Sequence, residues 1–186
     1  GSVTQVRGST RRLLQWAKAR QTPVILAGHV TKEGTVAGPR VLEHLVDVVL
    51  SLEGDSLTTF RLLRGVKNRF GSTNEVGVFE MRAEGLIDVS EPSQALLAGR
   101  QADAVGSAVV AVVEGARPLL VEVQGLTAGT VFSSPRRTCN GVDFQRLLVL
   151  VAVLTRRLGI PLGGVDVMVN VVGGIKIEEP ATDLGV

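Results

Sequence analysis

The sequence predicts an α/β protein, and three observations support this class. Apolar residues recur at helical spacing over residues 5–20, among arginines and glutamines, as in an amphipathic helix. Residues 23–27 form a short, continuous apolar run suited to a strand buried on both faces. Val-rich and alternating segments recur further along. A helix that leads into a buried strand is typical of a doubly wound α/β sheet.

The next part of the chain predicts strands that follow one another without long helices. After a helical turn at residues 41–45, the predicted strands cover residues 46–53, 58–63, 75–82 and 86–89. Glu84 and Gly85 supply a hairpin turn before the last of them. Such a succession is typical of the antiparallel edge of a mixed sheet.

A change of composition at residues 90–93 marks the best candidate for a domain boundary. Beyond it, strands are predicted at residues 106–114, 119–125 and 165–172. Residues 144–158 predict a largely buried helix that ends at Gly159 and Pro161. Residues 178–183, with their acids and proline, suit the first turn of a final helix.

Composition narrows the function classes only slightly. The formal net charge is +2, so any basic surface for nucleic acid must be local. The single Cys139 cannot form an internal disulfide, which fits a reducing compartment, and we assign it no chemistry. No apolar run is long enough to span a bilayer and no signal segment opens the chain, so we expect no membrane partner and a cytoplasmic location. With few aromatic residues, base stacking is disfavoured.

Residues 65–71 place two long cations, Lys67 and Arg69, at the exit of a predicted apolar strand. A solvated basic turn is the plain alternative for them. His29 follows the strand predicted at residues 23–27, at a strand end where open parallel sheets bind ligands, although a single histidine there is often structural.

Two further segments carry candidate cations. Lys32 and Arg40 flank a glycine-rich stretch that either closes over a phosphate backbone or is a surface loop. Arg136 and Arg137 lie in a basic loop, residues 133–138, which is either a second phosphate-contacting patch or a solvated connection.

Several familiar motifs are absent from the sequence. It has no G-x-x-x-x-G-K-[ST] phosphate loop and no G-x-G-x-x-G, and it has no H-x-x-x-H or C-x-x-C pair for a metal. We therefore predict no metal site, and no nucleotide pocket formed by these residues alone.

Three stretches together resemble the bacterial RadA (Sms) family of DNA-recombination ATPases. They are G-H-V-T-K-E-G at residues 28–34, A-G-P-R-V-L-E-H at residues 37–44 and K-N-R-F-G at residues 67–71. The resemblance continues through S-S-P-R-R at residues 133–137 and G-G at residues 173–174 to E-P at residues 179–180, so it covers nearly the whole chain.

The resemblance implies a domain plan. Members of this family have a zinc-finger module, a RecA-like ATPase core and a domain like that of Lon protease. We therefore expect residues 1–91 to be the C-terminal part of a RecA-like core with a mixed sheet. Residues 92–186 are expected to be a truncated, proteolytically inactive Lon-protease-like α/β domain. The zinc finger, phosphate loop and magnesium-binding strand would precede Gly1, so the chain is expected to be a fragment.

The resemblance also implies residue roles. Lys67 and Arg69 match the family's K-N-R-F-G motif and are expected to act in trans on ATP bound by the next subunit. His29 is expected to sense the γ-phosphate. Lys32 and Arg40 are expected to contact the DNA backbone, as are Arg136 and Arg137.

Asp183 stands where a Lon protease would have its serine nucleophile, in the stretch A-T-D-L-G at residues 181–185. A carboxylate cannot perform the same acylation chemistry. The resemblance therefore implies a protease fold that is no longer a protease.

The function implied is that of a DNA-dependent ATPase and ring-shaped DNA motor, a helicase or branch-migration enzyme in homologous recombination, DNA repair and the stress response. ATP and Mg²⁺ would be its cofactors, with zinc in the preceding module. Single-stranded and branched DNA, a hexameric ring of identical subunits and the RecA recombinase would be its partners. The main alternative is a non-catalytic platform for DNA binding and oligomerisation. A third class, an active Ser/Lys peptidase, is disfavoured by Asp183.

Overall fold

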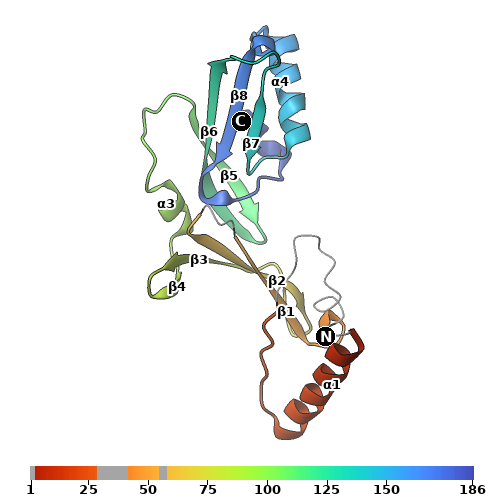
Figure 1. Ribbon diagram of the computed structural model, residues 1–186. Helices are drawn as coiled ribbons and strands as arrows, with labels where there is room; N and C mark the ends of the chain where they lie inside the picture. Colours follow the sequence, from red (N-terminus) through yellow and green to blue (C-terminus); the bar gives the residue numbers. More distant parts are fainter. Residues whose placement is uncertain (1–2, 29–41, 55–57) are drawn as a thin grey trace. The chain divides into compact units, whose positions relative to one another are not determined.

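The computed structural model describes residues 3–28, 42–54 and 58–186. The chain divides into two compact units, the first made of Gly1–Ser51 and Gly65–Thr73 and the second of Leu52–Arg64 and Asn74–Val186. Its strands form two four-stranded sheets, with a few helices between them in sequence (Figure 1). The predicted α/β class is confirmed. The predicted boundary near residue 91, and the likeness of the two parts to RecA and Lon, stay predictions.

The first sheet has the strand order β1-β2-β3-β4. Its strands are β1 Val48–Glu53, β2 Phe60–Asn68, β3 Val76–Arg82 and β4 Gly85–Asp88. The pairs β2–β3 and β3–β4 are antiparallel, as the succession of strands predicted. Strand β2 runs five residues past its predicted end, so Lys67 lies within a strand and not beyond it.

The second sheet is mixed and has the order β5-β6-β8-β7. Its strands are β5 Ser107–Glu114, β6 Arg117–Gly129, β7 Arg137–Asn140 and β8 Val165–Val171. Pairs β5–β6 and β6–β8 are antiparallel and β7–β8 is parallel. Gly115, with φ of +64°, opens the two-residue turn of the β5–β6 hairpin, a backbone conformation that glycine adopts without steric cost.

Besides the strands, the described chain contains three α-helices and three 3₁₀ turns. They are α1 Val3–Arg20, α3 Pro92–Leu97, α4 Phe144–Leu158, and the 3₁₀ turns Leu162–Gly164, Val172–Gly174 and Pro180–Gly185. The helix predicted at residues 5–20 is confirmed by α1. The prediction that residues 178–183 begin a final α-helix is wrong, because residues 180–185 form a 3₁₀ turn.

Helix α4 begins and ends where the sequence predicts. The Asp143 side chain accepts a hydrogen bond from the backbone N–H of Arg146 at 2.9 Å, which caps the first turn. Gly159 has φ of +68° and ends the helix in the left-handed conformation.

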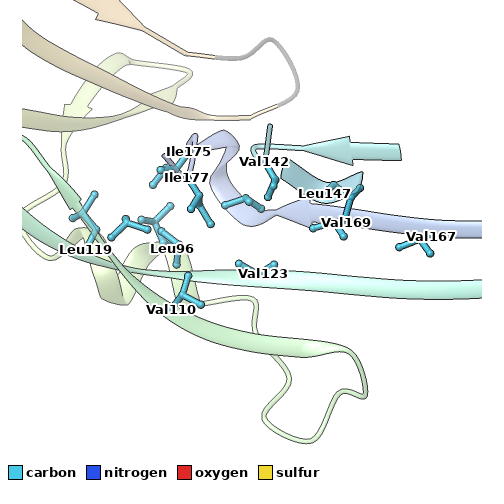
Figure 2. Packing of buried hydrophobic residues seen from close by; sticks show 13 residues of the cluster. Leu96, Val110, Leu119, Val123, Val142, Leu147, Val167, Val169, Ile175 and Ile177 are labelled. Carbon is cyan, nitrogen blue, oxygen red and sulfur yellow. The ribbon is translucent and has the colours of Figure 1, made fainter. Parts of the chain in front are cut away.

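The main hydrophobic core lies in the second unit, between its mixed sheet and the helices α3 and α4. It contains Leu96, Val110, Val112, Leu119, Val121, Val123, Val142, Leu147, Val167, Val169, Val171, Ile175 and Ile177. Figure 2 shows these side chains spread along the strands, from Leu119 near one end to Val167 at the other. On β6 and β8 the core residues alternate with exposed ones, so this sheet has one packed face and one open face.

The prediction that α4 is largely buried is wrong. Leu147 is buried, whereas Val149 and Val153 are 61% and 47% exposed. The helix is apolar around most of its circumference, but the sheet covers only one side of it. The length of an apolar run does not reveal how many neighbours it has.

Leu147→Ala is expected to lower the free energy of unfolding of the second unit by about 2–5 kcal/mol, because it opens a cavity in the packed core. Urea denaturation followed by circular dichroism measures this loss. Val149→Ala, on the exposed side of the same helix, is the matched control and should change it by less than about 0.5 kcal/mol. Equal losses for the two variants would contradict this packing.

The buried strand predicted at residues 23–27 is also wrong. The segment has no regular secondary structure, and Ile25 is 96% exposed. A strand is held by hydrogen bonds to neighbouring strands, and no strand among the described residues pairs with this segment. Apolar composition alone does not supply those partners.

Candidate functional site

The Lys67 ammonium is bound to the turn that precedes β1. Its Nζ donates to the backbone carbonyls of Glu43 at 2.6 Å and Val46 at 2.8 Å. The turn itself is closed by hydrogen bonds from Leu45 and Val46 to the carbonyl of Leu42. Lys67 therefore satisfies carbonyls at the end of a helical turn, and two of its three N–H groups are used in doing so.

Arg69 is held more loosely. Its Nη1 lies 2.9 Å from Oδ1 of Asp47, and the Arg69 and Asp47 side chains are 52% and 39% exposed. Its backbone N–H also donates to the Asp47 carbonyl at 3.1 Å. The backbone bond fixes the position of the residue. The exposed ion pair contributes only about 0–1 kcal/mol, so the guanidinium is easily released to a stronger anion.

The residues between and after the two cations shape the loop. The Asn68 Oδ1 accepts from the Phe70 backbone N–H at 3.0 Å, and its Nδ2 donates to the Ser72 carbonyl at 3.2 Å. This local ring of hydrogen bonds is an Asx-type turn. It leaves Phe70 80% exposed beside Arg69. An exposed aromatic residue next to an arginine is a combination enriched in protein–protein interfaces.

Sequence reasoning missed Asp47 and the role of Asn68. Asp47 lies within a predicted strand, 22 positions from Arg69, so nothing local points to the pair. Asn68 was detectable, because an Asn side chain in a turn commonly accepts a hydrogen bond from the backbone two residues on, here from Phe70. His29, Lys32 and Arg40 lie outside the described residues, and their roles stay predictions.

The two neighbouring arginines of the basic loop have different surroundings. The Arg137 guanidinium donates to the carbonyls of Leu162 and Val165, both at 2.6 Å, and so ties the start of β7 to the approach to β8. The Arg136 guanidinium instead stacks on the Phe132 ring, 3.4 Å from its centre. Arg136 is exposed, so of the two it is the better placed to meet a phosphate.

Asp183 is part of an ion pair. Its Oδ1 accepts from Nε of Arg146, whose other nitrogens donate to the carbonyls of Glu178 and Glu179. Thr182 donates to the Glu179 carbonyl as well, at 2.6 Å. The residue at the expected nucleophile position therefore anchors the last turn to α4.

Cys139 and possible metal ligands are also present among the described residues. Burial, and to a lesser extent the Asp143 carboxylate, raises the pKa of the Cys139 thiol, which disfavours the reactive thiolate. Within the described ranges, no group of three or more His, Cys, Asp or Glu side chains is arranged to hold a metal ion. In the same residues, no helix combines the length and apolar character that crossing a bilayer requires.

Arg64 joins two acidic groups in the second unit. It contacts Glu114 through Nη1 and lies 3.1 Å from Glu53 through Nε. Glu114 is only 7% exposed, so its carboxylate depends on this arginine for charge compensation. Arg64 and Glu114 are 50 positions apart, and the sequence analysis did not pair them.

Comparison with known proteins identifies the chain's relatives. No family model matches it. It is 52% identical over 186 residues to the DNA repair protein RadA of Bacillus subtilis, all of this chain and 41% of that protein. It is 54% identical over 186 residues to DNA repair protein RadA of Streptococcus pyogenes, again 41% of the relative. In Synechocystis the RadA protein is 52% identical over 184 residues, 99% of this chain and 36% of the relative.

The chain thus spans about two fifths of the length of the curated relatives that it matches. Sequence identity above one half over the whole chain is far higher than a chance match of a few motifs would give. The chain therefore corresponds, over its whole length, to a part of the bacterial RadA family of DNA repair proteins.

Proposed function

We propose that this chain is part of a DNA-dependent ATPase that works as a ring-shaped motor in DNA repair and recombination. The observation that carries the proposal is the K-N-R-F-G loop. It presents one firmly placed cation, Lys67, and one releasable cation, Arg69, beside the exposed Phe70. The RadA match supplies the setting, since the relatives are named as DNA repair proteins.

The chemistry assigned to the loop is stabilisation of a transferring phosphoryl group. Negative charge spreads over the γ-phosphate oxygens during transfer, and an arginine from a neighbouring subunit lowers the barrier by compensating it. The Arg69 fork binds phosphate through two parallel hydrogen bonds, whereas Asp47 holds it in the loop in the meantime. The third N–H of Lys67 is proposed as a second contact. ATP and Mg²⁺ are the proposed cofactors, held outside this loop.

Further parts of the motor are proposed from the resemblance to the RadA family. His29 is the γ-phosphate sensor, and Lys32, Arg40 and Arg136 contact the DNA backbone. Arg137 is also a predicted contact, although three of its hydrogen bonds go to carbonyls of its own chain. Single-stranded and branched DNA are the proposed substrates, with helicase or branch-migration activity, a hexameric ring, zinc in another part of the protein, and RecA as partner. The proposed location is the cytoplasm.

The second candidate function is a DNA-binding and oligomerisation platform without catalysis. Asp183, bound to Arg146, is consistent with a former catalytic domain that now serves assembly. ATP turnover and gel filtration together separate the two candidates.

The test uses a chimera in which this chain replaces the matching segment of Bacillus subtilis RadA. A ring motor should assemble and hydrolyse ATP, and single-stranded DNA should raise its turnover several-fold. An assembly that binds DNA but leaves ATP turnover at background, with or without DNA, would favour the platform. The unexchanged Bacillus subtilis protein is the control.

A further inference from the structure

A row of polar side chains crosses the open face of the second sheet. Ser107 on β5 lies directly opposite Gln124 on β6, which lies opposite Asn170 on β8, which is aligned with Asn140 on β7. These four residues, which we call the amide row, lie on the face opposite the hydrophobic core, because Val123 beside Gln124, and Val169 and Val171 beside Asn170, are core residues.

Hydrogen bonds join the amide row from end to end. Nδ2 of Asn140 donates to Asn170 Oδ1 at 3.1 Å, and Nδ2 of Asn170 donates to Gln124 Oε1 at 3.4 Å. Nε2 of Gln124 donates to Oε1 of Glu122 at 3.3 Å, and the Ser107 hydroxyl donates to the same oxygen at 2.6 Å. The row is therefore a chain of donors directed toward one carboxylate.

Glu122 sets the direction of that chain. It is only 3% exposed, and its Oε1 accepts hydrogen bonds from both Ser107 and Gln124. Gln124 must therefore turn its NH₂ group toward Glu122 and its oxygen toward Asn170. For the same reason, Asn170 turns its NH₂ group toward Gln124, and Asn140 turns its NH₂ group toward Asn170. Each amide is held in one orientation, with one of its two N–H groups used in the row.

The amide row forms part of the lining of a hollow of about 500 Å³. This volume is within the range of small-ligand sites. Beside the row, Leu126 and Met168 lie opposite each other on the same face, 61% and 39% exposed, and provide an apolar strip. The lining residues include no Lys or Arg, so the hollow is not built for a phosphate group.

Arg136 immediately precedes β7, whose Thr138 and Asn140 line the hollow. It lies two residues or about 7 Å from Thr138 along an extended chain, and its backbone N–H donates to Oδ1 of Asp166 on β8 at 2.7 Å. Its guanidinium lies over the Phe132 ring. A stacked cation therefore precedes β7, and the open face beside this strand carries an apolar strip and then oriented amides.

We propose that this face binds an unpaired nucleobase of single-stranded DNA, with the amide row contacting the base edge and Arg136 contacting a neighbouring phosphate. A carboxamide offers a donor and an acceptor side by side, the pattern that pairs with adenine. The Leu126–Met168 strip accommodates the flat face of the ring. The inference rests on the proposed function and adds to it a base-contacting site distinct from the backbone contacts.

The test measures binding of the 186-residue chain to an adenine decanucleotide and to an abasic decanucleotide of the same backbone. Asn170→Ala should weaken binding of the adenine oligonucleotide about tenfold and leave the abasic one unchanged. Gln145→Ala, an exposed amide on α4 and so outside this face, is the control and should alter neither.

Nuclear magnetic resonance gives a readout that a merely structural role would not move. The side-chain NH₂ signals of Asn140, Asn170 and Gln124 should shift with the adenine oligonucleotide and not with the abasic one. Glu122→Gln keeps the shape but removes the carboxylate that orients the row, and it should reduce the preference for bases over abasic backbone.

Two results would overturn the inference. If Asn170→Ala leaves both affinities unchanged, or lowers them equally, the amide row does not contact bases, although the proposed DNA motor still stands. If the chain binds neither oligonucleotide, the DNA-binding part of the proposed function fails and this site fails with it.

Discussion

Arg69→Ala in the Bacillus subtilis chimera should lower DNA-stimulated ATP turnover about 10³-fold, while assembly and ATP binding persist. Arginines that reach a nucleotide from a neighbouring subunit contribute about 10³–10⁵ in kcat. The geometry suits this role, because Arg69 is positioned through its backbone and held only by an exposed ion pair with Asp47. Steady-state ATP turnover at saturating ATP measures the loss.

Two further variants sharpen this test. Arg82→Ala removes another exposed arginine that pairs with a carboxylate, Glu80, and it should leave turnover within about twofold of the unmodified chimera. Asp47→Ala frees the Arg69 side chain without removing it, and turnover should change by less than about fivefold. A loss after Asp47→Ala as large as that after Arg69→Ala would show that the ion pair itself is required, which contradicts the assigned role.

Arg64→Met should destabilise the second unit by about 3 kcal/mol. The change leaves Glu114, which is 7% exposed, as a buried carboxylate without its cation, and breaking a buried pair from one side costs about 3–5 kcal/mol. The lower end applies because the Arg64 side chain is 28% exposed. Thermal or urea denaturation followed by circular dichroism gives the difference.

The double variant Arg64→Met with Glu114→Gln separates charge from packing. Removing the orphaned charge should restore more than half of the lost stability. Arg82→Met, at the exposed pair with Glu80, is the matched control and should cost less than about 1 kcal/mol. If Arg64→Met is no worse than this control, Glu114 does not depend on Arg64.

The sequence predicted well those helices and strands whose ends are marked by nearby residues. Helix α4 was predicted with correct ends, from the apolar pattern of residues 144–158 and from Gly159 and Pro161 after it, and the structure adds Asp143 as the cap of its first turn. Strands β5, β6 and β8 were predicted because they are Val-rich, whereas β7 was missed, because residues 133–138 were interpreted as a basic loop. The apolar run at residues 23–27 failed for the opposite reason, since its partners, and not its composition, decide whether it is a strand.

The candidate sites depended more on distant contacts. The sequence singled out Lys67 and Arg69, but not the carbonyls or the Asp47 carboxylate that hold them. It treated Arg136 and Arg137 alike, whereas the Arg137 guanidinium bonds carbonyls of its own chain and the Arg136 guanidinium stacks on Phe132. The amide row brings together residues from four strands, and only the register of the sheet places them in line.

The central claim is that Arg69 acts on ATP held by another subunit, and mixed assemblies test it most directly. One subunit carries Arg69→Ala, and the other carries an intact Arg69 but a substitution that abolishes its own ATP binding. Neither variant alone should hydrolyse ATP above background. Mixing them should restore measurable turnover, because an intact Arg69 then meets an intact nucleotide site across the subunit boundary. Stable mixed assemblies that stay inactive would contradict action in trans.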